Sequence, residues 1–371
     1  MSKERHYFPG NNTPLGFYSY YKHILGQREA NKIICIKGGP GTGKSTFMKK
    51  FANSFSKKGE DIDYLHCSAD ENSIDGVVLK NKKVAIIDGT SPHIIDPITP
   101  GAVDKIINLG EYWNQNGIEA NKEEIIDLNE ETSKWYRIAY NYLNAAKSVY
   151  RSLEEIYNSA AEASEIYGLV ADIIGKEYSK YDISMIPGRV KKFFASAITA
   201  SGVVHYIPTL LEEMNTVYMI NVPVGFTNNS IMEIISEGAI YRGLDVECYY
   251  CPMCPEQKIE HIIIPKLKIA FVTMNDYHDI EPWEISDLWE NDRQIILIDM
   301  NDYMDNYIVA KNEELIKSLY EGYDALLNKT FINLSRAKNI HLKVENMYIP
   351  NMNFTEVEKV LKNIIDELEI V

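Results

Sequence analysis

The chain repeats one pattern twice, and this repeat constrains its fold more than any other feature. Phe8 matches Phe194, 186 positions later, where FPGNNTPLGFYSYY and FASAITASGVVHYI align without a gap. Similar matches continue to the two tails. A chain built in this way folds into two related units, because each copy carries the same hydrophobic pattern. We therefore predict two domains, 1–187 and 188–371, separated by a Pro-Gly turn.

The first half has the hydrophobic pattern of alternating strands and helices. Its predicted strands are 32–36, 62–66 and 84–87, and its first predicted helix is 47–55. Such alternation predicts a parallel sheet. From 118 to 161 apolar residues recur at three-, four- and seven-residue steps without a proline, which predicts a long amphipathic helix or a helix pair. We assign this helical extension to about 114–182 and expect its counterpart in the second half.

The string GGPGTGKST follows the first predicted strand and satisfies the pattern G-x-x-x-x-G-K-[ST] of a phosphate-binding loop. Backbone N–H groups at a helix N-terminus wrap a polyphosphate there, and side chains would obstruct them. Lys44 is expected to meet the β- and γ-phosphates, and the Ser45 hydroxyl to hold Mg²⁺. The predicted binding residues are Gly38, Gly39, Pro40, Gly41, Thr42, Gly43, Lys44, Ser45 and Thr46.

A Walker B pattern follows at 84–88, where four apolar residues place Asp88 at the carboxyl end of a strand. We expect Asp88 to hold Mg²⁺ directly or through water. A surface Asp-Gly turn is the alternative, and no Glu follows to polarise water.

Other residues at the same edge could act as the base or position water: His66, Ser68, Asp70, Thr90, His93 and Glu111. Beside Lys44 and Asp88 we select His93, because a histidine recurs at His278, and Glu111, although structural roles for such residues are common.

The second half lacks the residues that would bind a triphosphate. The alignment places Asn228 opposite Lys44, and Asn229 opposite Ser45. Thr273 stands opposite the metal acid of the first half. We therefore predict one active site in the first half and a pseudo-site in the second, whose domain packs against, regulates or completes the first.

Three cysteines of the second half, together with a histidine, raise the alternative of a zinc site. Cys248, Cys251 and Cys254 precede His261, but this is not a standard paired-knuckle spacing. The duplication places a cysteine, Cys67, opposite only one of them. We therefore do not favour a zinc site.

Composition limits the partners. The chain has 53 Asp+Glu against 38 Lys+Arg, a net charge of −15, so a nucleic-acid partner is not expected. The five cysteines are scattered, which is typical of a reducing compartment. The N-terminal string MSKERHYFPGNN lacks the features of a secretory signal, and no apolar run reaches the length of a membrane span. We expect a cytoplasmic protein without a membrane partner.

Five strings carry a resemblance to a known family: HYFPGNNTPLGFYSYY, IKGGPGTGKST, LHCSADENSIDGVV, IIDGTSPH and GAVDKIINLGEYW. They resemble a bacterial family of tandem-duplicated P-loop ATPase-like proteins, and the likeness covers nearly the whole chain. The resemblance implies ATP binding and an α/β fold of two tandem P-loop NTPase-like parallel-sheet domains, each with an appended helical module. In that family both halves often carry an intact loop, a pattern from which Asn228 and Asn229 depart.

These features predict a Mg²⁺-dependent ATP-binding protein that acts as an ATPase. ATP is preferred over GTP because no N-K-x-D string occurs. One alternative is a nucleotide or small-molecule kinase, with His66 or Asp70 near the acceptor, although such kinases clamp phosphates with several arginines. Another is a nucleotide-gated binding protein with slow hydrolysis. The protein or small-molecule partner and the oligomeric state stay open.

Overall fold

Each half folds into the same succession of elements in the computed structural model, which describes residues 2–90, 95–226, 229–281 and 293–369. The first half contains β1 (Glu4–Tyr7), β2 (Gly10–Thr13), β3 (Gly16–Ser19), η1 (Tyr21–His23), β4 (Lys32–Lys37), α1 (Lys44–Ser56), β5 (Ile62–His66), β6 (Ile74–Leu79), β7 (Val84–Asp88), β8 (Asp104–Asn108), η2 (Leu109–Tyr112), α2 (Gln115–Glu119), α3 (Lys122–Ala160) and α4 (Ala163–Tyr178). The second half contains β9 (Val190–Phe193), β10 (Ser196–Thr199), β11 (Gly202–His205), α5 (Ile207–Leu211), β12 (Thr216–Asn221), α6 (Asn229–Ile240), β13 (Val246–Tyr250), β14 (Ile259–Ile264), β15 (Ile269–Met274), β16 (Gln294–Asp299), η3 (Met300–Tyr303), α8 (Asn306–Lys311), α9 (Glu313–Tyr348), η4 (Ile349–Asn351) and α10 (Phe354–Glu369).

The elements repeat at the offsets found in the sequence. β9 begins 186 positions after β1, β13 begins 184 positions after β5, and α9 begins 191 positions after α3. The two halves are therefore structural repeats, and the predicted boundary at 187–188 lies in the connection between α4 and β9.

Each half builds one six-stranded mixed sheet. The first has the order β1-β5-β6-β7-β4-β8, and the second has the equivalent order β9-β13-β14-β15-β12-β16. The pairs β1–β5, β4–β7 and β4–β8 are parallel, whereas β6 runs antiparallel to both of its neighbours. The α/β prediction is confirmed, but the prediction of a wholly parallel sheet is wrong at β6.

The connection from β6 to β7 explains the antiparallel strand. Only residues 80–83 separate the two strands, and Lys83 has a φ of +54°. A parallel neighbour needs a crossover of roughly a dozen residues or more, whereas a short turn joins antiparallel strands. The apolar pattern predicted no strand in this segment, so the hairpin was not expected.

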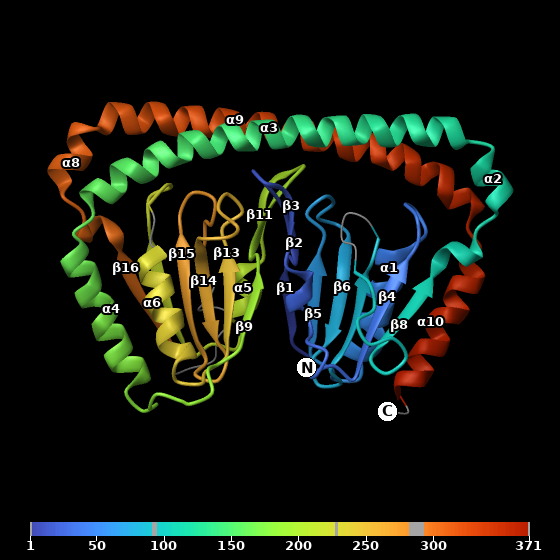
Figure 1. Cartoon of the computed structure of the whole chain (residues 1–371), viewed down its shortest axis with the longest axis horizontal. Coiled ribbons are helices and arrows are strands. Elements are labelled where there is room, and N and C mark those ends of the chain that lie inside the picture. The colour runs from blue at the N-terminus through green and yellow to red at the C-terminus, as the bar shows by residue number, and fades with distance from the viewer. Residues whose placement is uncertain (1, 91–94, 227–228, 282–292, 370–371) are drawn as a thin grey trace.

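Two long helices lie across both sheets. α3 has 39 residues and α9 has 36, and they run side by side above the two sheets (Figure 1). The helix predicted from 118 to 161 is thus one long helix preceded by the short α2. Leu143 and Ala146 of α3 share a buried cluster with Leu327 and Leu334 of α9, as expected from apolar residues at helical spacing.

Each helical extension packs on the sheet of the other half. α3 and α4 belong to the first half, but Leu153 and Ile166 lie in the core with the second sheet and α6. α10 ends the second half, but Leu361 and Ile364 lie in the core with α1 and the first sheet. Figure 1 shows the red α10 beside the blue first sheet and the green α4 beside the second. Neither half therefore contains all the helices that cover its own sheet.

The two halves also share a core. One buried cluster combines Leu65 and Ile87 of the first sheet with Val217 and Val272 of the second. The backbone N–H groups of Phe8 and of its duplicate Phe194 donate to each other's carbonyl oxygens at 2.9 Å. No described helix combines the length and apolar character that crossing a membrane requires.

Candidate functional site

The predicted phosphate loop lies between β4 and α1. β4 is a buried central strand of the first sheet; the chain then passes through residues 38–43, and α1 begins at Lys44. Gly41 and Gly43 have φ values of +66° and +85°, in the left-handed region that glycine adopts without strain. The first turn of α1 leaves N–H groups without helical partners at this point. The glycines thus allow the chain to close tightly onto a helix N-terminus.

Lys44 extends across the loop. Its Nζ donates to the carbonyl oxygens of Gly38 at 2.9 Å and Gly39 at 3.0 Å. It also lies 3.6 Å from Oδ2 of Asp88, and both side chains are 13% exposed. Oxygen atoms of the loop and of Asp88 therefore surround the ammonium.

Asp88 ends β7, the neighbour of β4. Its Oδ1 accepts a hydrogen bond from the N–H of Thr90 at 2.8 Å, and the Thr90 hydroxyl donates to the carbonyl of Gly38 at 3.1 Å. These contacts fix the Asp88 carboxylate beside the loop, with Oδ2 toward Lys44. A carboxylate is a ligand that Mg²⁺ prefers, so Asp88 fits the predicted role.

The remaining loop residues complete the turn into α1. The Thr42 hydroxyl donates to the carbonyl of Gly39 at 2.8 Å, and the Ser45 hydroxyl oxygen accepts the N–H of Ile74 at 3.1 Å. Pro40 is half-buried and Thr46 is exposed. The chain thus places Ser45, its second candidate Mg²⁺ ligand, between α1 and the start of β6.

Of the two other predicted catalytic residues, only Glu111 lies within the described residues. Glu111 lies on η2 after β8, on the opposite side of β4 from Asp88, and its side chain is exposed. His93 lies outside the described residues. The structure therefore adds no contact in favour of either residue.

His66 ends β5 and Ser68 follows that strand, which lies two strands away from β7 and Asp88. His66 Nε2 lies 2.8 Å from His6 Nδ1, and its ring stacks on Tyr206 of the second half. Burial, with a smaller contribution from His6, lowers the pKa of His66 to about 4. His66 is thus a neutral interface residue at physiological pH. The Ser68 hydroxyl is buried without a hydrogen-bond partner.

The second half covers the loop. The close contacts are Gly39 with Tyr348, Gly41 with Glu345, and Gly43 with Phe354. A Cβ built on Gly39 would lie 2.9 Å from Cε1 of Tyr348, and one built on Gly41 would lie 2.7 Å from the carbonyl oxygen of Glu345. Packing against α9 and α10 therefore requires glycine here independently of any phosphate.

α9 also brings polar residues to this edge of the sheet. Lys338 Nζ lies 2.7 Å from Oδ1 of Asp70 and 3.2 Å from Oε2 of Glu71. Burial opposes the charge of Lys338, but hydrogen bonds to the two carboxylates raise its pKa. His341 lies one turn further along the helix. Neither Lys338 nor His341 was predicted from the sequence; the one signal was that the duplicate helix keeps a lysine at Lys147.

The equivalent loop of the second half is covered by a long helix of the first half, α3. Gly225 is the duplicate of Gly41, and a Cβ built on it would lie 2.5 Å from Cβ of Leu153 on α3. Asn228 lies outside the described residues, and Asn229 begins α6. The duplication has therefore kept the contact between loop and long helix.

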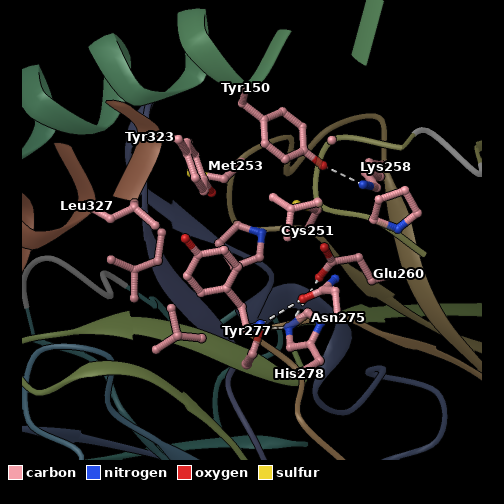
Figure 2. A pocket seen from close by; sticks show the side chains of 17 residues that line it. Tyr150, Cys251, Met253, Lys258, Glu260, Asn275, Tyr277, His278, Tyr323 and Leu327 are labelled. Atoms are coloured by element: carbon pink, nitrogen blue, oxygen red, sulfur yellow. Dashed lines mark hydrogen bonds and ion pairs between the residues drawn. The ribbon is translucent and has the colours of Figure 1, made fainter. Parts of the chain in front are cut away.

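A small cavity of about 40 Å³ lies beside the second loop, under the aromatic side chains of α3 and α9 (Figure 2). Its polar side is formed by Lys258, Glu260 and His278. Lys258 Nζ donates to Oη of Tyr150 at 2.5 Å and to the carbonyl of Phe226 at 3.1 Å. A cavity of this size holds a few water molecules, but not a triphosphate.

Three buried residues near this cavity have the composition of a metal site: Glu260, His261 and His278 offer atoms within 4.8 Å of one another. The N–H of Thr273, however, donates to Nδ1 of His261 at 3.1 Å. The neutral ring then carries its proton on Nε2, the other nitrogen, which presents a donor instead of a lone pair. Burial lowers the pKa of both histidines. The proton on Nε2 therefore argues against His261 as a metal ligand in this arrangement.

The three cysteines considered for zinc do not converge. Cys248 packs with α4 and α6, whereas Cys251 and Cys254 pack under α3 and α9. All three are buried free thiols. Burial raises the pKa of the Cys251 thiol well above its usual value, which disfavours the thiolate that zinc requires.

Similarity to known proteins gives no information about this site. No model of a known protein family, no curated protein and no solved structure matches this chain. The most informative arrangement is the one around Lys44, where one loop, one strand-end carboxylate and the helices of the other half meet.

Proposed function

We propose that the protein is a Mg²⁺-dependent ATPase with one active site in its first half. The observation that carries this proposal is the position of Lys44, whose ammonium lies over the carbonyls of Gly38 and Gly39 and 3.6 Å from Asp88. A cation, a carboxylate and a helix N-terminus then meet at one sheet edge, which is the combination that phosphoryl chemistry uses.

In this proposal each group has one role. The N–H groups of the loop and the ammonium of Lys44 bind the β- and γ-phosphates. Ser45 and Asp88 hold Mg²⁺, which when bound neutralises charge on the same phosphates. Thr90, tied to both Asp88 and the loop, keeps the carboxylate in place.

The residues at hand favour hydrolysis over transfer to a second substrate. A nucleotide kinase clamps phosphates with several arginines. Arg5 is instead buried in an ion pair with Glu247. The other arginines of the first half have exposed side chains: Arg28, Arg137 and Arg151. Water is therefore the acceptor that the site supports best.

A Lys44→Ala substitution tests the proposal, with Lys50→Ala on the same helix as the control. Lys50 is exposed and pairs with Glu358, so its loss should leave the loop intact. Calorimetric titration with Mg²⁺-ATP should give one site in the wild type and in Lys50→Ala, and no detectable binding in Lys44→Ala with an unchanged far-UV spectrum. Equal ATP affinity in all three proteins would refute the site.

Measuring the product separates hydrolysis from its alternatives. The wild type should release phosphate in the absence of any added acceptor. Transfer to an added nucleotide or small molecule at a higher rate than phosphate release would indicate a kinase. Tight ATP binding without turnover would indicate a nucleotide-gated binding protein.

A further inference from the structure

A cation of the second half lies against the carboxylates that follow β5 at this edge of the first sheet. Lys338 contacts Oδ1 of Asp70 at 2.7 Å, and Oδ2 of Asp70 accepts the Ser73 hydroxyl at 2.9 Å. Ile74, next in the chain, donates its N–H to Ser45 at 3.1 Å. A short series of contacts thus connects Lys338 to the candidate metal ligand Ser45.

His341 is a second residue of α9 that lies near this edge of the first sheet. It lies three residues after Lys338, on the same face of α9. Burial lowers the pKa of His341 most; the charge of Glu345 opposes this, and the charges of Lys44 and Asp70 contribute less, in opposite directions. This segment of α9 is therefore close enough to Lys44 and Asp70 to feel both charges.

Residues of the second half contact this edge of the first sheet at a second point. Glu71 accepts hydrogen bonds from Lys338 and, at 2.7 Å, from the hydroxyl of Ser201 in the β10–β11 turn. Asp70 and Glu71 together balance the lysine with two carboxylates. A polyphosphate bound at the loop would offer Lys338 a competing set of anionic oxygens.

We propose that Lys338 acts on the γ-phosphate during hydrolysis, so that the second half supplies the activating cation of the first-half site. This inference rests on the ATPase function proposed above. The oxygen of water bonds to the γ-phosphorus, and the bond from phosphorus to the bridging oxygen breaks with its electron pair on ADP. One proton of the water passes to a γ-oxygen and the other stays on the attacking oxygen, so the products are ADP and dihydrogen phosphate. Lys338 leaves Asp70 and Glu71 and neutralises the charge that this step places on the γ-oxygens.

The duplicated helix provides a matched control. Lys147 stands 191 positions before Lys338, on α3, and its charge acts on Cys254, the duplicate of Asp70. Removing Lys147 deletes an equivalent lysine over the loop that has lost its catalytic residues. Lys338→Ala, Lys338→Arg and Lys147→Ala should therefore be compared with the wild type.

We expect Lys338→Ala to lower kcat by roughly 10²-fold, the effect of losing one transition-state donor. ATP affinity should change by less than about threefold, because the contact forms mainly in the transition state. Lys338→Arg should recover most of kcat, and Lys147→Ala should match the wild type. A structural role alone would lower the melting temperature without this separation of kcat from affinity.

Two results overturn the inference. One is a Lys338→Ala protein that hydrolyses ATP at the wild-type rate, and the other is a Lys147→Ala protein with an equal loss of kcat. A wild type that binds no ATP would instead refute the proposed function, before Lys338 is tested.

Discussion

Arg5 of β1 and Glu247 of β13 form a buried ion pair between the two halves. Nη2 of Arg5 lies 2.5 Å from Oε2 of Glu247 and donates to Oη of Tyr249 at 2.9 Å. Asp63 adds a second carboxylate, 3.8 Å from Nε of Arg5. The side chains of the pair are only 11% and 14% exposed, so removal of one partner would leave a poorly solvated charge.

Glu247→Gln should destabilise the protein in a pH-dependent manner. Burial opposes the charge, but Arg5 holds the pKa of Glu247 below its usual value. The stabilisation is therefore present above the unfolded pKa of about 4.3 and is lost as the pH falls through the lower folded pKa. We expect a loss of about 3 kcal/mol at pH 7 that shrinks below about pH 4. Denaturant unfolding from pH 7 to pH 3 measures both values.

Glu213→Gln is the control for this experiment. Glu213 pairs with Lys3 at a more exposed position, where such pairs contribute roughly 0–1 kcal/mol. A Glu247→Gln effect as small as that of Glu213→Gln, or one independent of pH, would contradict the assigned role.

Gly41→Ala should disturb the loop more than Gly59→Ala disturbs its turn. Both residues have positive φ, +66° and +85°, so each alanine costs about 1–2 kcal/mol in backbone strain. Only at Gly41 does the new Cβ also meet a neighbour, the carbonyl of Glu345, whereas nothing lies within 4 Å at Gly59. Gly41→Ala should lose ATP affinity in a Mg²⁺-ATP titration, and Gly59→Ala should not. Equal affinities would show that α9 does not constrain the loop.

Asp88→Asn should remove the benefit of Mg²⁺ while leaving some ATP binding through Lys44. The neutral amide keeps the acceptor for Thr90 but weakens a metal ligand. ATP titrations with Mg²⁺ and with EDTA should differ in the wild type and converge in the variant. Asp96→Asn is the control, since Asp96 pairs with Lys37 and is 75% exposed. A variant whose ATP affinity still rises with Mg²⁺ would contradict the predicted metal role of Asp88.

Because each helical extension packs on the sheet of the other half, we predict that each half needs the other in order to fold. A fragment of residues 1–187 lacks α9 and α10, so the apolar surface that receives Leu361 and Ile364 is exposed. We expect it to aggregate when expressed alone and to form a soluble complex when coexpressed with 188–371. Size-exclusion chromatography distinguishes these outcomes. A monomeric fragment 1–187 that unfolds cooperatively would contradict the dependence.

The sequence predicted features whose residues are close in the chain. The strand at 32–36, the loop that follows and the helix after it are consecutive, so glycine spacing and apolar runs identify them directly. Asp88 was predicted for the same reason, because its apolar strand ends at the residue itself. β6 was missed because its direction depends on the short turn to β7, a feature that the apolar pattern does not record.

Tertiary structure decided which helical extension covers each sheet. The two halves have similar apolar patterns, so a helical extension could bury its residues on either sheet, and the sequence alone does not choose. The length of α3 decides: 39 residues extend about 60 Å, which carries the chain past its own sheet to the other. The same geometry brings Lys338 to Asp70 and Tyr348 to Gly39 of the predicted phosphate loop, contacts between distant segments that no local motif marks.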